Sequence, residues 1–199
     1  METKKRIYCI EGVHDWGDGK IEPTVEPMLE LLQKTGYWDY LHRTCATSAE
    51  LRYRLEEEWN EVCEKGSVLY FASHGAPDQV WLSDEVAGLV TMKEWADCTG
   101  CHVHFGGCDT FSGGEHNLSD FMNSTNATSV SGYAREVGWV DWTAPALTLE
   151  LQFFAQLSGV NIVNQTRNRA RNLRRVEQAV SKRFPDCEFN MLVRPYGQR

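Results

Sequence analysis

The 199-residue sequence lacks any long apolar run, which excludes a helix that crosses a membrane. Such a helix needs about 20 apolar residues, and one of the longest apolar stretches here covers only residues 68–72. The charged start of the chain does not lead into the apolar segment of a signal peptide either. We therefore expect a cytoplasmic protein without a membrane partner.

Phosphate-binding motifs are also missing. Neither Gly-x-Gly-x-x-Gly nor Gly-x₄-Gly-Lys-Ser/Thr occurs, so dinucleotide-binding and P-loop proteins are excluded and no cofactor is expected. Positive charge is scarce as well: Lys and Arg number 20 against 28 Asp and Glu, for a net charge of −8. This balance argues against nucleic acid as a specific partner.

The few basic residues are unevenly placed. Residues 165–183 hold seven Lys or Arg and one acid, and the pattern there predicts a helix. Four of its arginines fall on one face at spacings of three and four: Arg167, Arg171, Arg174 and Arg175. Two interpretations stay open. The face is either solvated and paired with acids of the same chain, or it binds an anionic small-molecule effector or an acidic protein.

The order of patterns along the chain predicts the fold class. Short apolar runs of strand type alternate with stretches at helical spacing, and the run at residues 67–73 is apolar on both faces, as in a central parallel strand. Strands separated by helices imply crossover connections. We therefore expect one α/β domain over residues 1–199, a three-layer sandwich with a mainly parallel sheet covered by helices on both faces.

The two strongest predicted strands end in residues that carry chemistry. One runs into His74 and Gly75, and the other ends in Gly106, Gly107 and Cys108. If these strands are neighbours, an imidazole and a thiol lie at the same edge of the sheet, which is the pair that a thiol nucleophile requires. The flanking glycines leave amide N–H groups free to stabilise an oxyanion.

These residues resemble the caspase-like cysteine peptidases. The stretch Leu69-Tyr-Phe-Ala-Ser-His-Gly is similar to the strand that carries their base, and a hairpin, a short helix at residues 92–98 and a strand ending in Cys108 follow in the family's order. The resemblance continues through Ser131-Gly-Tyr-Ala and Gly138-Trp-Val-Asp-Trp. The Gln-Ala-Cys-x-Gly signature is absent, and His74 precedes Cys108 by 34 residues rather than about 50.

The resemblance implies a cysteine endopeptidase that acts on polypeptides, of the small standalone kind found in bacteria, often in defence. Cys108 would attack the scissile carbonyl, His74 would manage the proton, and the amides of Gly75 and Cys108 would bind the oxyanion. Caspases place arginines in their pocket and cut after Asp. Here Asp15 and Asp141 fall in the corresponding regions, so we expect Arg or Lys before the cut, and a ligand or partner that controls activity.

Two alternatives to a peptidase remain. The spacing Cys98-Thr-Gly-Cys101-His102-Val-His104 resembles half of a zinc site, although no second Cys-x₂-Cys or His-x₃-His pair accompanies it. The leading interpretation uses no metal. The chain could also be a non-catalytic α/β signalling or binding module that acts through the basic helix at residues 165–183.

Overall fold

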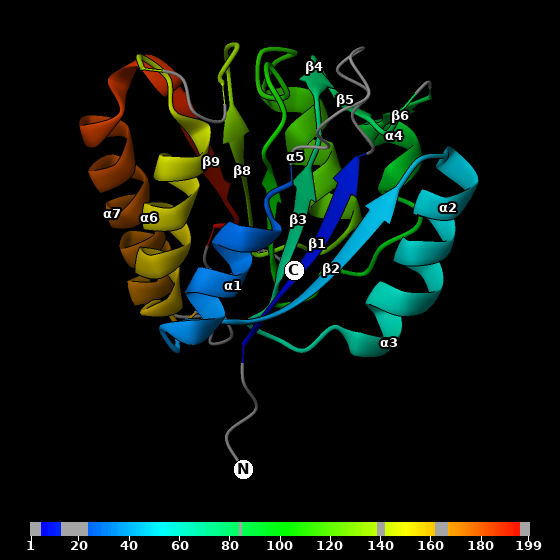
Figure 1. Cartoon of the computed structure of the whole chain (residues 1–199), viewed down its shortest axis with the longest axis horizontal. Helices are drawn as coiled ribbons and strands as arrows, with labels where there is room; N and C mark the ends of the chain where they lie inside the picture. The colour runs from blue at the N-terminus through cyan, green and yellow to red at the C-terminus, as the bar shows by residue number, and fades with distance from the viewer. Residues whose placement is uncertain (1–4, 13–23, 84, 139–141, 162–166, 196–199) are drawn as a thin grey trace.

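The computed structural model describes residues 5–12, 24–83, 85–138, 142–161 and 167–195. Six strands form the central sheet in the order β2-β1-β3-β7-β8-β9 (Figure 1). They are β1 (Arg6–Gly12), β2 (Asp39–Cys45), β3 (Val68–Ala72), β7 (His102–Phe105), β8 (Ser129–Tyr133) and β9 (Phe189–Val193). The first five run parallel, and β9 pairs antiparallel with β8. The predicted fold class is confirmed.

Helices cover both faces of this sheet, as Figure 1 shows. On one face lie α1 (Glu26–Lys34), α6 (Ala146–Ser158) and α7 (Arg167–Arg183). On the other lie α4 (Leu89–Met92), α5 (Glu115–Ser124) and a continuous helix made of α2 (Ser48–Tyr53), the π-helical η1 (Arg54–Trp59) and α3 (Asn60–Val62). A short 3₁₀ helix, η2 (Pro185–Cys187), precedes β9. No described helix combines the length and apolarity that a bilayer crossing requires.

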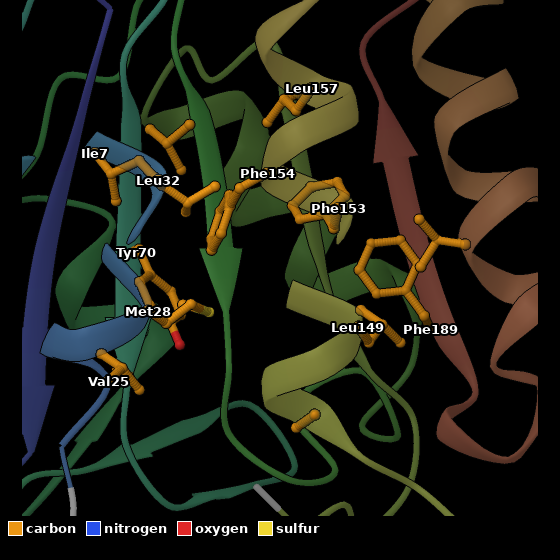
Figure 2. Packing of buried hydrophobic residues seen from close by; sticks show 14 of the residues in the cluster. Ile7, Val25, Met28, Leu32, Tyr70, Leu149, Phe153, Phe154, Leu157 and Phe189 are labelled. Carbon is orange, nitrogen blue, oxygen red and sulfur yellow. The ribbon is translucent and has the colours of Figure 1, made fainter. Parts of the chain in front are cut away.

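Each face of the sheet has its own apolar core. Alternate residues of β3 point to opposite sides, so Val68 and Tyr70 pack under α1 and α6, whereas Leu69 and Phe71 pack under the other helices. Figure 2 shows the first core, where Phe153 and Phe154 of α6 project toward the sheet beside Tyr70 of β3 and Phe189 of β9. This two-sided burial explains why β3 is apolar throughout.

A small three-stranded sheet follows β3, with the order β4 (Gly75–Ala76), β5 (Gln79–Trp81) and β6 (Val86–Gly88). The expected hairpin is present, but the helix expected at residues 92–98 is misplaced. Helix α4 occupies Leu89–Met92 instead, because Leu89 and Met92 are both buried and stand at helical spacing.

Candidate functional site

His74 and Cys108 follow neighbouring strands at equivalent positions. Strand β3 pairs in parallel with β7, and Phe71 lies opposite Phe105. Each candidate residue comes three positions after its strand's paired phenylalanine, so the turns that carry them leave the same edge of the sheet. His74 is exposed and Cys108 is partly buried. The carboxyl edge of a parallel sheet is where α/β proteins place their ligands.

The two turns contact each other through their backbones. A methyl group added at Gly75 would lie 2.5 Å from the carbonyl oxygen of Cys108, and one added at Gly107 would lie 2.9 Å from Cα of Gly75. Only glycine allows this approach. The main chain of Gly75 and that of Cys108 therefore lie side by side, as a shared oxyanion site between their amides would require.

The described interactions of the Cys108 thiol are with the backbone of Val137. The Sγ atom donates to the carbonyl oxygen of Val137 at 3.2 Å and accepts from its amide N–H at 3.3 Å. The turn is fixed against the end of β8 by further bonds, since the amide of Asp109 donates to the Arg135 carbonyl at 3.1 Å and that of Phe111 to the Tyr133 carbonyl at 2.9 Å. Cys108 is thus held by the segment after β8.

Burial raises the pKa of the Cys108 thiol, and the carboxylates of Glu136 and Asp109 raise it further. The Val137 amide acts in the opposite direction, because its N–H favours the thiolate. The balance favours a protonated thiol near neutral pH. In this arrangement Cys108 is a thiol bonded to Val137, and a nucleophilic thiolate would require that environment to change.

The main chain of His74 is held by hydrogen bonds to its carbonyl oxygen. Its carbonyl oxygen accepts hydrogen bonds from the amide of Trp81 on β5, at 2.9 Å, and from the hydroxyl of Ser73, at 2.8 Å. The small sheet β4-β5-β6 therefore fixes the turn that bears the imidazole. The side chain remains exposed at the edge, where a proton can be exchanged with substrate or water.

The two carboxylates predicted for a substrate pocket, Asp15 and Asp141, lie outside the described residues. Glu11 belongs to β1 and is buried. It accepts hydrogen bonds from the amide of Val25 at 2.8 Å and the hydroxyl of Thr24 at 2.7 Å, so it anchors the start of α1. Asp109 and Glu136 are the described carboxylates that act on Cys108.

The structure does not bring together the residues that suggested a zinc site. Cys98 and Cys101 pack in the core beneath α5, and Cys101 lies 3.1 Å from Cys63, sulfur to sulfur. His102 and His104 are on the opposite face of the sheet, because they occupy the alternate positions of β7 that point toward α6. Among the described residues, no group of three or more His, Cys, Asp or Glu could hold a metal ion.

Sequence reasoning missed a buried polar network under the Cys108 turn. Seven side chains share it: Tyr70, His102, His104, Ser129, Ser131, Tyr133 and Glu150. The hydroxyl of Tyr70 donates to Glu150 at 2.5 Å, and the hydroxyl of Ser131 lies 2.8 Å from ring nitrogens of both His102 and His104. A single acid within the apolar run of α6 was the signal available in the sequence.

This network also explains why residue 106 has no side chain. A methyl group at Gly106 would lie 2.8 Å from a carboxylate oxygen of Glu150 and 2.9 Å from the ring of Tyr70. The core therefore occupies the space that a side chain at position 106, two residues before Cys108, would need.

The predicted basic helix is confirmed as α7, and it lies apart from the His74 and Cys108 turns, packed on α6 and β9. Arg171, Arg174 and Arg175 are exposed, whereas the side chain of Arg167 lies outside the described set. Arg169 is buried, and burial lowers its pKa. Within the described residues, the three exposed arginines form no ion pair with an acid, but the charge of Arg174 acts on Glu177, so neither interpretation of this face is decided.

The fold and the site define a three-layer α/β protein with an imidazole and a thiol at the carboxyl edge of its sheet. The chain belongs to a family of unknown function, DUF6642, whose model matches residues 4–173. A comparison with curated proteins gives no match. The structure is similar to that of Raptor from Chaetomium thermophilum, with a TM-score of 0.52, 11% sequence identity and 77% of this chain covered. The match spans 18% of the Raptor chain, so it shows a shared fold alone.

Proposed function

We propose that this protein is a cysteine endopeptidase of the caspase-like kind, with Cys108 as nucleophile and His74 as the group that takes and returns the proton. The observation that carries the proposal is the placement of the two residues at equivalent positions after adjacent parallel strands. A thiol with a base at the same edge is the minimum arrangement for acyl transfer.

The substrate in this proposal is a polypeptide with Arg or Lys before the cut. Glu136 and Asp109 are close enough to Cys108 to raise the pKa of its thiol, so the potential at the nucleophile is negative. A cationic substrate side chain would be attracted there, and an acidic one would be repelled. A cation bound beside these carboxylates would also weaken their effect on the thiol, and the pKa of the Cys108 thiol would then fall toward neutrality.

We propose in addition that an effector or partner controls the activity, as a protease of defence systems would require. Support comes from the Cys108 thiol, which is bonded to the Val137 carbonyl and has a raised pKa. The active state would turn the Sγ atom from Val137 toward His74 and the substrate carbonyl. The proton would pass from Cys108 to His74 and then to the leaving amine as the thioester forms, and water would release the acid product.

The decisive experiment compares the wild-type chain with Cys108→Ala in a proteome-wide search for new peptide N-termini. Expected are new ends after Arg or Lys with the wild type, none with Cys108→Ala, and a loss of about 10²-fold or more with His74→Ala. Cys45→Ala serves as the control, since Cys45 is buried in the apolar core on the opposite face of the sheet from the core against which Cys108 packs. Biological function that survives in Cys108→Ala would instead favour a non-catalytic module that acts through α7.

A further inference from the structure

Helix α7 presents a row of cations to solvent. Four exposed cations lie on one side of this helix, because the last three follow the first by three, four and eleven positions. We name them the basic face: Arg171, Arg174, Arg175 and Lys182. The same side of the helix also carries the amide side chains of Asn168 and Gln178. The helix's single acid, Glu177, points inward and accepts the amide of Met191 at 2.9 Å.

Helix α7 differs from the other helices because its basic face forms no ion pair in the described part of the chain, although the charge of Arg174 acts on Glu177 and offsets part of the rise that burial causes in the pKa of that carboxyl. Arg54 pairs with Glu50 at 3.1 Å, Arg52 with Glu56 at 2.9 Å, and Lys34 with Glu30 at 2.7 Å. None of the four residues of the basic face pairs with an acid in the described part of the chain. Like charges at these spacings repel, so an external anion would stabilise the face.

A complementary surface exists on the same molecule. Five exposed carboxylates surround the end of η1 and α3, and we name them the acidic face: Glu57, Glu61, Glu64, Glu94 and Asp97. Asn60 connects helix α3 to residues 95–97. Its side-chain amide donates to the Trp95 carbonyl at 3.3 Å, and its side-chain oxygen accepts from the Asp97 amide at 3.0 Å. Lys65 borders this surface, with its stem against Gly100. In the described part of the chain, the five acids form no ion pair.

The two faces lie toward opposite ends of the long axis of the molecule, with α7 at one end of Figure 1 and the continuous helix of α2, η1 and α3 at the other. They cannot meet within one chain. We propose that the occupant of the basic face is the acidic face of a second copy of this protein. Because the two surfaces differ, the contact is head to tail, and it builds a ring or an open filament rather than a two-fold dimer.

A second copy fits the charges better than a free anion. Arg171 and Arg175 are four residues apart, as are Glu57 and Glu61, so two helices can present matched pairs of opposite charge. The net charge of −8 makes whole molecules repel, but this repulsion is screened within about 10 Å in ordinary buffers, whereas contacting pairs are screened less. The assembly therefore depends on the two faces and weakens as salt rises.

The test uses sedimentation velocity of the full chain in roughly 50 mM and roughly 500 mM salt, which differ strongly in screening. We expect concentration-dependent assembly at low salt and dissociation at high salt. The double variant Arg171→Glu/Arg174→Glu and the double variant Glu57→Lys/Glu61→Lys each place like charges against like, which should raise the dissociation constant about 100-fold or more. Lys34→Glu, an exposed change on α1, should assemble as the wild type does.

Mixing the two double variants decides the question even if one of them is less stable alone. Each still carries one native face, so an equimolar mixture should assemble although neither variant does so by itself. A mixture that stays monomeric, or a wild-type chain that is monomeric at low salt, overturns the proposal. In the second case, binding of duplex DNA or polyglutamate that is lost in Arg171→Glu/Arg174→Glu would assign the basic face to a foreign polyanion.

Discussion

Tyr70 and Glu150 form a hydrogen bond of 2.5 Å, hydroxyl to carboxylate, at a depth where neither side chain is exposed. Burial raises the pKa of Tyr70 strongly, and the Glu150 charge raises it further, so the hydroxyl remains a donor at every working pH. Glu150 also accepts from the Tyr133 hydroxyl at 3.2 Å and lies 3.4 Å from a ring nitrogen of His104. The pair joins α6 to β3 directly beneath the turn of Cys108.

Removing the donor should destabilise the fold. In Tyr70→Phe, a buried carboxylate loses its shortest hydrogen bond, and we expect the free energy of unfolding to fall by about 1–3 kcal/mol. Urea denaturation measures this, with the exposed Tyr53→Phe as control. A change below about 0.5 kcal/mol would contradict the role given to the pair.

The contact between the two site turns predicts a penalty at Gly107. In Gly107→Ala the new methyl group would lie 2.9 Å from Cα of Gly75, so the turns must separate. We expect a loss of about 1–3 kcal/mol in stability, as for overpacked sites, together with reduced peptidase activity. Gly88→Ala is the matched control, because its methyl group meets no atom within 4 Å. Equal stability of the two variants would show that the turns are not in contact.

His102 predicts a dependence of stability on acid. Burial lowers the pKa of His102 well below 6.5, and neighbouring His104 adds to this effect. The unfolded chain binds a proton there below about pH 6.5 while the native chain does not, so stability falls as the pH drops below that value.

His102 should change the free energy of unfolding by at most about 1.4 kcal/mol per pH unit. Denaturation at a series of pH values should show a shallower acid slope in His102→Gln, whatever its absolute stability. Equal slopes in the two proteins would mean that His102 is protonated in the native state.

Alkylation of Cys108 should report its raised pKa. Cys108 is partly buried, whereas Cys9, Cys45, Cys98, Cys101 and Cys187 are buried, so iodoacetamide should modify Cys108 sooner than these five. The rate should keep rising above pH 9, because the thiolate is the reactive form and both burial and the carboxylate neighbours disfavour it. Peptide mapping over a pH series measures both the order in which the cysteines are modified and the pH dependence of the rate at Cys108. A rate that levels off below pH 8 would indicate a thiolate paired with His74 in the resting chain.

The acids beside Cys108 should set substrate preference. We expect reporter peptides with Arg or Lys before the cut to be cleaved about tenfold or more faster than those with Asp. Asp109→Asn combined with Glu136→Gln should reduce this preference. Asn suits position 109 because Asp109 has φ of 55°, a left-handed conformation that Asn tolerates. Faster cleavage after Asp would contradict the proposed specificity, though not the identity of the nucleophile.

Several features followed from the sequence alone. The alternation of strand and helix patterns determined the α/β class, and the apolar run at residues 67–73 determined a central buried strand. The spacing of arginines determined the charged side of α7. These are local properties, since periodicity of two or 3.6 residues and the turn residues that end each element are set by neighbours in the chain.

Tertiary packing decided the rest. Helix α5 has a short apolar stripe at helical spacing, Leu118, Phe121 and Met122, among polar residues, and it is stabilised because these side chains fill the core beside β8. The pairing of β3 with β7 brought His74 and Cys108 to one edge, and the pleat of β7 separated His102 and His104 from Cys98 and Cys101. The order of strands in a sheet and the side to which a residue points depend on contacts distant in sequence, which no local pattern records.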